Sequence, residues 1–137
     1  MTAATVAVAA SAAHQVPKPY AAGLVALPFT AAMATTQLDD VGDITELGYL
    51  PANCTVIGFI VTATDMDTGT PALVYKLTAG STDLVTGITT GQSAGTAFFG
   101  CTPTALTAVT KLQVNITTVS ATAAAGTLNV VALYING

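Results

Sequence analysis

The sequence has 137 residues, a length that suits one domain with a single core. Only 7% of the residues are charged, against about 25% in ordinary soluble domains, and 52% are hydrophobic. Three lysines, no arginine and seven acidic residues give a net charge of −4, so we expect no nucleic-acid partner, because phosphate binding needs clustered cations. We expect no membrane partner either, since polar residues interrupt every stretch before about 18 consecutive apolar residues accumulate.

The 22 N-terminal residues differ from the rest of the chain. They are rich in alanine and contain Pro17 and Pro19, which prevent a continuous helix. We expect an extended arm over residues 1–22, either ordered by contacts with neighbouring molecules or frayed as a free end. Because Lys18 is the first basic residue and no leucine-rich stretch precedes it, we expect no secretory signal. Residues 23–137 are expected to form one β-sandwich domain.

From residue 23 onward, apolar residues recur with the period of two that is typical of β-strands. Residues 111–117 are the clearest example, with polar residues such as Gln113 and Asn115 expected to face outward. The residues of this segment expected in the core are Leu112, Val114 and Ile116. Residues 57–63 alternate in the same way. The residues expected on their core face are Ile57, Phe59, Val61 and Ala63.

Residues 127–134 also alternate, but this segment becomes apolar on both faces toward its end, as a central or interface strand does. The residues expected on its core face are Leu128, Val130, Ala132 and Tyr134. Shorter strands are expected at 24–30, 44–49, 72–77, 84–88 and 96–101.

Turn-forming residues separate these segments, because Gly, Pro, Asp and Asn favour tight changes of direction. Turns are expected at 39–42, 50–53, 67–69, 79–81 and 102–103. One helical turn could form over residues 120–125. About eight short strands with no helical apolar stripe predict an all-β fold, an antiparallel β-sandwich of jelly-roll type.

Two groups of acidic residues are candidate calcium sites, because Ca²⁺ prefers clustered carboxylate oxygens. The first group contains Asp39, Asp40, Asp43 and Glu46. In the second group, Asp65 and Asp67 begin an Asp-x-Asp-x-Gly segment like that of a calcium loop, but Lys76 stands where an EF-hand has its closing glutamate. The alternative is that these residues shape the connections between strands. We favour this alternative, and expect neither a metal nor a cofactor.

The sequence predicts no catalytic residues. His14 is the only histidine, and it lies in the expected arm, away from a scaffold that could pair it with a nucleophile and a carboxylate. Cys54 and Cys101 could form a disulfide if their Cα atoms lie within about 7 Å. Free thiols are the favoured alternative, since no secretory signal is expected. We therefore expect a protein that is not an enzyme.

Threonine and alanine shape the expected surface, with 25 and 26 residues respectively. Threonine suits pleated, half-exposed faces. A threonine-rich face is polar without being charged, so it can be buried against another subunit at modest cost when its hydroxyl groups are hydrogen-bonded. A free monomer needs a charged coat to stay dispersed. Because so few charges are available, we expect partner molecules to cover much of this surface.

Two segments carry a resemblance to a known family. Residues 42–53 read GDITELGYLPAN and precede a hydrophobic strand, and residues 65–73 read DMDTGTPAL and open the next strand. This succession resembles the small head-decoration, or cement, proteins and related structural virion proteins of tailed bacteriophages. The resemblance implies a β-sandwich that binds the outside of an icosahedral capsid and reinforces the joints between major capsid subunits. No catalytic residues come with the family.

The expected function is therefore that of a capsid decoration protein in the virion, assembled in the host cytoplasm. Its expected partners are the major capsid protein or another virion protein, together with copies of itself in a homo-oligomer such as a trimer. A tail, neck or fibre component of the virion is one alternative. A carbohydrate-binding β-sandwich module is another, although sugar-binding platforms need exposed aromatic faces and the chain has no tryptophan.

Overall fold

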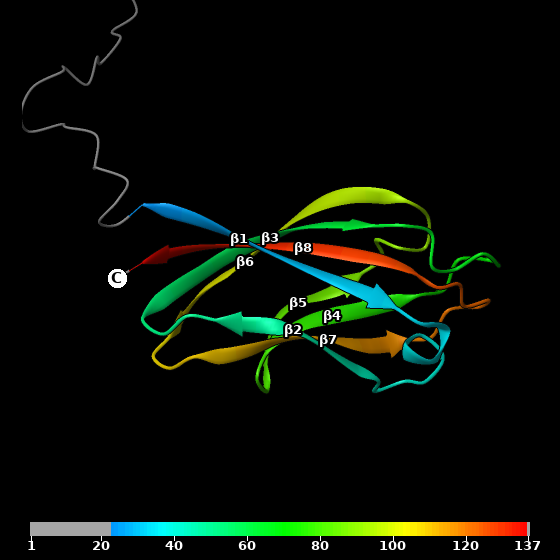
Figure 1. Ribbon diagram of the computed structural model, residues 1–137, viewed down its shortest axis with the longest axis horizontal. Helices are drawn as coiled ribbons and strands as arrows, with labels where there is room; N and C mark the ends of the chain where they lie inside the picture. The colour runs from blue at the N-terminus through cyan, green and yellow to red at the C-terminus, as the bar shows by residue number, and fades with distance from the viewer. Residues whose placement is uncertain (1–22, 137) are drawn as a thin grey trace, which may run out of the picture.

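The computed structural model describes residues 23–136, which form eight strands and one short 3-10 helix (Figure 1). The strands are β1 (Leu24–Met33), β2 (Ile44–Leu50), β3 (Cys54–Ala63), β4 (Val74–Ala79), β5 (Thr82–Ile88), β6 (Gly95–Leu106), β7 (Thr110–Thr118) and β8 (Gly126–Asn136). The helix, η2 (Thr35–Gln37), is too short to cross a membrane, and residues 23–136 contain no longer one. The expected arm over residues 1–22, which includes His14 and Lys18, lies outside the described residues.

Two four-stranded antiparallel sheets pack face to face (Figure 1). One sheet has the strand order β1-β8-β3-β6 and the other has the order β2-β7-β4-β5. The β4–β5 hairpin stays within one sheet, and each of the other connections between described strands crosses to the opposite sheet. This arrangement is that of a jelly roll. It confirms the expected all-β sandwich, and a strand lies at each of the eight expected segments.

The core lies between the two sheets and consists mainly of alternate apolar residues of the strands, together with Leu38, Met66 and Leu73 from the connections. On β7, Leu112, Val114 and Ile116 are at most 2% exposed, whereas Gln113 and Asn115 point outward and are only half-buried. Strand β8 buries the four residues expected on its core face: Leu128, Val130, Ala132 and Tyr134. The faces predicted for these two strands are therefore confirmed.

Strand β3 departs from the expected alternation at Ile57, which is half-buried and not part of the core. The register of β3 against β8 shifts between Val56 and Gly58, so one extra residue bulges out of the ladder. Since side chains alternate with a period of two, this extra residue changes the phase of the core-facing positions. Val56 faces the core before the bulge, and Phe59 resumes the core face after it.

The expected turn at residues 102–103 is wrong, because β6 continues through Pro103 to its end at residue 106. A proline, which has no N–H group, is tolerated in a strand at the edge of a sheet, and β6 is such a strand. The register of β6 against β3 is irregular between Gly100 and Thr104, which accommodates the proline. Thr102 and Pro103, which were expected to form a turn, therefore belong to an irregular strand at the edge of the sheet.

The connections β1–β2, β3–β4 and β7–β8 lie together at one end of the sandwich, on the right in Figure 1. The Thr68 N–H donates to the Thr122 carbonyl at 3.0 Å, and the Ala124 N–H donates to the Met66 carbonyl at 3.1 Å. Residues 120–125 contain two bends and an isolated bridge from Ala123 to Asp67, so the alternative of a helical turn there is wrong. Two connections distant in sequence are thus paired like short strands.

We expect Val114→Asp to prevent folding, because an unpaired buried carboxylate costs several kcal/mol, a large part of the total stability of a domain. Gln113→Thr is the control, since it keeps a strand-forming polar residue on the outer face and should cost less than about 1 kcal/mol. An acidic control is avoided because Glu46 lies directly opposite Gln113. Urea denaturation followed by circular dichroism measures both variants. Equal losses of stability would show that the face assignment of β7 is wrong.

Candidate functional site

Asp67, in the β3–β4 connection, is the only charged residue that is buried within residues 23–136, where it is 2% exposed. Its Oδ2 atom accepts hydrogen bonds from the N–H groups of Ala72 at 2.8 Å and Leu73 at 3.0 Å. Its Oδ1 atom accepts one from the N–H group of Thr122 at 3.1 Å. One carboxylate therefore ties the β3–β4 connection to the β7–β8 connection.

These hydrogen bonds control the ionisation of Asp67. Burial alone acts to raise the pKa of the carboxyl group, but the backbone N–H groups of Ala72, Thr122, Ala121 and Leu73 outweigh it and lower the pKa from 3.8 to about 2. The group is therefore ionised at neutral pH. Its contribution to stability is fully present above the unfolded-state pKa near 4, and it is lost as the pH falls toward 2.

Asp65 is exposed, and its Oδ1 atom accepts a hydrogen bond from the Asp67 N–H group at 3.0 Å. The two carboxylates therefore face backbone N–H donors, whose partial positive charge attracts an anion and not a cation. These hydrogen bonds favour the alternative in which both residues shape the connection. The expectation that no metal binds at Asp65 and Asp67 stays a prediction.

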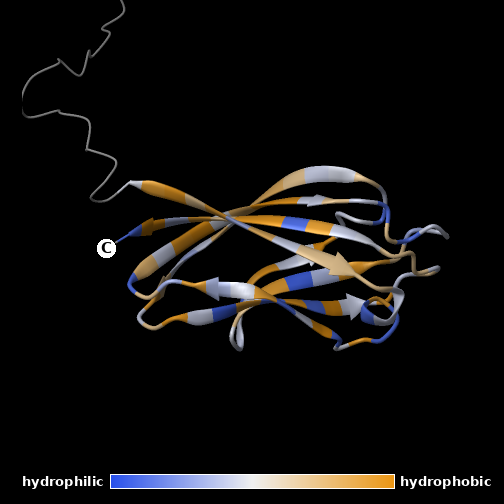
Figure 2. Ribbon diagram, in the orientation of Figure 1, coloured by the Kyte–Doolittle hydropathy of each residue, from blue (hydrophilic) through white to orange (hydrophobic). Residues whose placement is uncertain are grey.

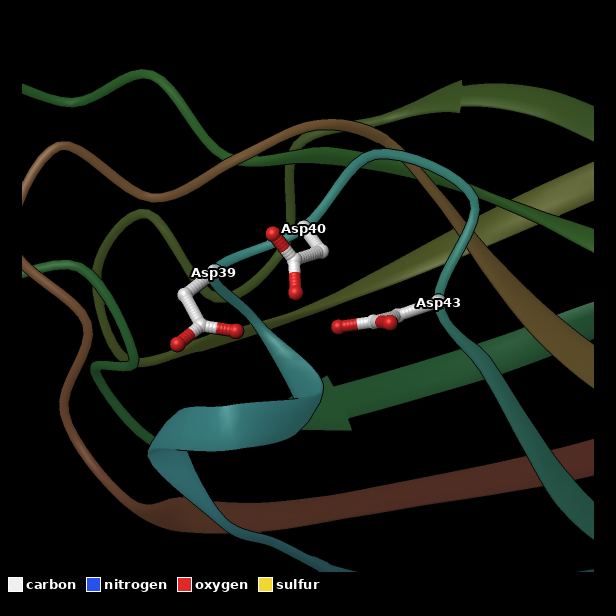
Figure 3. Close-up of side chains that lie close together, drawn as sticks. All are labelled: Asp39, Asp40 and Asp43. Carbon is white, nitrogen blue, oxygen red and sulfur yellow. The ribbon is translucent and has the colours of Figure 1, made fainter.

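The structure brings together three residues of the other acidic group (Figure 3). One carboxylate oxygen from each of Asp39, Asp40 and Asp43 lies within 4.8 Å of the others. The Oδ2 atom of Asp43 is buried and has no hydrogen-bond partner among the described residues. Glu46 does not join this group, because it accepts a hydrogen bond from the Lys111 ammonium at 2.9 Å on the outer face of β2 and β7. The expectation that no metal binds in this group likewise stays a prediction.

Cys54 and Cys101 are free thiols, as favoured from the sequence. The Cys54 thiol donates to the Pro51 carbonyl at 3.1 Å, and the Cys101 thiol donates to the Val56 carbonyl at 3.6 Å. Burial raises the pKa of both thiols. Because the thiolate is the reactive form, both cysteines are poor nucleophiles and serve as small packing residues.

An apolar row crosses the outer face of the β1-β8-β3-β6 sheet. Pro28 pairs with Val131, Val131 with Ile60, and Ile60 with Phe98, so the row extends over all four strands. The Phe98 side chain is 64% exposed. Figure 2 shows the hydrophobic colour along β1, β3 and β8. Sequence reasoning did not find this row, although the two-sided apolar character of residues 127–134 was one sign of it.

The opposite sheet has a different outer face, which carries ion pairs. Lys76 lies 3.0 Å from Asp83, and Lys111 lies 2.9 Å from Glu46. Such exposed pairs contribute little to stability, because water screens them, but they keep a surface hydrated. The two outer faces of the sandwich are thus chemically distinct.

We expect Asp67→Asn to destabilise the fold by about 2–3 kcal/mol at pH 7, because an amide NH₂ group cannot accept the N–H bonds that a carboxylate oxygen accepts. The difference in unfolding free energy between the two proteins should shrink as the pH falls from 4 toward 2, where the wild-type carboxylate becomes protonated. Asp65→Asn, an exposed change next to Asp67, is the control and should cost less than about 1 kcal/mol. A difference that stays constant over this pH range would refute the role of the Asp67 charge.

We expect EDTA and calcium chloride to give the same melting temperature for the wild-type chain, since a resident ion would stabilise the folded state by mass action. A rise with calcium that disappears in Asp43→Asn would instead assign a cation site to Asp39, Asp40 and Asp43. A rise that disappears in Asp65→Asn would assign it to the β3–β4 connection. Differential scanning calorimetry of the three proteins distinguishes these results.

No protein-family model and no curated protein matches the chain. Chains in solved structures are similar to it in fold. A chain of the cyanophage Pam1 capsid asymmetric unit superposes with a TM-score of 0.71 at 16% identity, covering 96% of this chain and 99% of that one. A chain of the Ralstonia phage GP4 capsid superposes with a TM-score of 0.69 at 23% identity, covering 92% and 93%. The fold of this chain therefore matches, over nearly its whole length, that of chains in two phage capsid structures.

Proposed function

We propose that this chain is a structural virion protein that decorates the outside of a phage head and stabilises it by binding major capsid subunits. The observation that carries the proposal is the likeness in fold to chains of two phage capsids over at least 92% of each chain compared. The resemblance of residues 42–53 and 65–73 to head-decoration proteins supports the same role. Both comparisons concern capsids, which favours the head over a tail, neck or fibre position.

The chemistry of the described residues supports a role in assembly and not in catalysis. The carboxylate of Asp67 is engaged by three backbone N–H groups that hold two connections together. The thiols of Cys54 and Cys101 are kept protonated by burial. These groups maintain the fold, and their hydrogen bonds leave them poorly suited to act on a substrate.

The positions of the exposed aromatic side chains do not suit a carbohydrate-binding module. Tyr49 and Phe98 are the largest exposed aromatic residues of the described part, at 58% and 64% exposure. Tyr49 lies on the outer face of the β2-β7-β4-β5 sheet, and Phe98 lies on that of the other sheet. A sugar-binding platform needs aromatic rings on one surface. These two rings serve different surfaces.

The proposal is tested on purified phage particles. Mass spectrometry of separated heads and tails should find the chain in the head fraction, and an electron-microscopy map of the particle should place the jelly roll on the outside of the shell. Heads that lack the protein should release their DNA at a lower temperature than complete heads, and added protein should restore the difference. Detection only in tails, or in neither fraction, would contradict the proposal.

We expect deletion of residues 1–22 to leave the β-domain folded, because both sheets are complete within residues 23–136. A chain of 22 residues can extend at most about 70–80 Å, far enough to reach a neighbouring subunit. Attachment to heads should therefore weaken at least about tenfold, equivalent to about 1.4 kcal/mol. Circular dichroism checks the fold, and binding to heads that lack the protein measures attachment. A chain with residues 1–22 in scrambled order is the control for length, and equal binding by the truncated and full chains would refute a role for the arm.

A further inference from the structure

The outer face of the β1-β8-β3-β6 sheet presents an apolar surface, which we call the uncharged face. Its main residues are Leu24, Pro28, Ile60, Phe98, Val131 and Ile135. The most exposed of them are Phe98, at 64%, and Leu24, at 59%. These residues are scattered in sequence and become neighbours through strand pairing. Exposed apolar patches that cross a whole sheet mark interaction surfaces, because single exposed apolar residues are ordinary but contiguous ones are not.

Phe98 lies where its ring can make such a contact. A Cβ atom added at Gly58 would lie 3.2 Å from two carbon atoms of the Phe98 ring, so the glycine allows the ring to lie on the backbone of β3. The other face of the ring remains in solvent, with the side chain 64% exposed. A ring that lies on the β3 backbone and still exposes most of its surface has the position of an interface anchor.

Some polar side chains of the uncharged face are already hydrogen-bonded to one another within the sheet. Beside the apolar row, the Thr30 hydroxyl donates to Asn129 Oδ1 at 2.8 Å. The hydroxyls of Thr62 and Thr96 share a hydrogen bond at 2.9 Å. Because these side chains already bond to one another across neighbouring strands, covering them costs less than covering free hydroxyls.

Charge decides which partner suits this face. Within residues 23–136, strands β1, β3, β6 and β8 contain no Asp, Glu, Lys or Arg. The described charges lie on the other sheet or in the connections at the ends of the strands. A charged partner surface would lose hydration here without gaining a counter-charge. The partner must therefore present an uncharged surface.

A second copy of the chain presents such a surface. Two copies carry a net charge of −4 each and repel one another. The end with the Asp39, Asp40 and Asp43 carboxylates is the least favourable for contact, whereas the uncharged face brings no like charges together. Four strands about 4.8 Å apart and ten residues long cover roughly 600 Å², comparable with the roughly 800 Å² that each partner contributes to a standard interface.

We propose that the uncharged face is the surface through which this chain associates with a second copy of itself. Apolar side chains of the two outer faces then pack against each other, as the inner faces do within the sandwich. The ion-paired face of each copy stays in contact with water. This inference adds a contact surface to the proposed virion role. It rests on that role only in so far as the association is placed in a virion.

The test compares two matched substitutions in the full-length chain. Phe98→Asp and Tyr49→Asp each replace an exposed aromatic residue by the same charge, on opposite outer faces. Sedimentation equilibrium should show that the wild-type chain self-associates, that Phe98→Asp raises the dissociation constant at least about tenfold, and that Tyr49→Asp changes it less than about twofold. Ile60→Thr keeps a β-branched residue on the central strand and should also weaken association, which covers the case in which Phe98→Asp fails to fold.

Three results would overturn the inference. The first is a wild-type chain that stays monomeric at about 1 mM, and the second is an equal loss of association in Phe98→Asp and Tyr49→Asp. The third is a Phe98→Asp chain that self-associates normally but no longer binds phage heads, which would assign the face to a capsid subunit. Self-association through this face in a chain that is absent from phage particles would uphold the inference and refute the proposed function.

Discussion

The connections at one end of the sandwich depend on a single buried charge. The β3–β4 connection passes from one sheet to the other, and the β7–β8 connection returns in the opposite direction. Asp67 accepts N–H bonds from both, at 2.8–3.1 Å. A buried carboxylate is costly unless its lone pairs are satisfied, so this group tolerates only the arrangement in which the two connections meet. It therefore favours the closure in which the β3–β4 and β7–β8 connections pair with each other.

The two outer faces differ in charge because the chain has few charged residues to distribute over its surface. Because only 7% of the residues are charged, they are too few to cover the whole surface with hydrated side chains. The chain concentrates its ion pairs, Glu46–Lys111 and Lys76–Asp83, on one sheet and leaves the other sheet without charge. A protein that stays alone in solution gains nothing from this asymmetry. A subunit that turns one face toward a partner and the other toward water gains from both faces, which is why the proposed role in a virion fits the surface as well as the fold.

Strand positions and core faces were predictable because they depend on local alternation. The alternation of apolar and polar residues over 111–117 is enough to predict which side chains of this strand face the core. The structure buries all three of them: Leu112, Val114 and Ile116. Ile57 was not predictable, because the bulge beside it is set by how β3 pairs with a strand that lies about 75 residues later in the chain. The role of Asp67 depends on Thr122 in the same way, and a sequence motif suggested calcium where the structure has backbone donors. Long-range pairing, which has no signal in a single sequence, decides what these residues do.

Threonine side chains explain how the proposed contact surface could meet water in the free chain and still be buried in an assembly. A charged residue on the β1-β8-β3-β6 sheet would keep a free chain hydrated, but its burial would then need a counter-charge from the partner. An all-apolar sheet would bury easily, but it would aggregate before it reached its place. Thr30 with Asn129, and Thr62 with Thr96, hydrogen-bond across neighbouring strands and still expose atoms that water can solvate. Because these bonds lie within the sheet, they would persist if the proposed association removed water from this face, and the high threonine content suits a β-sandwich with few charges that assembles in this way.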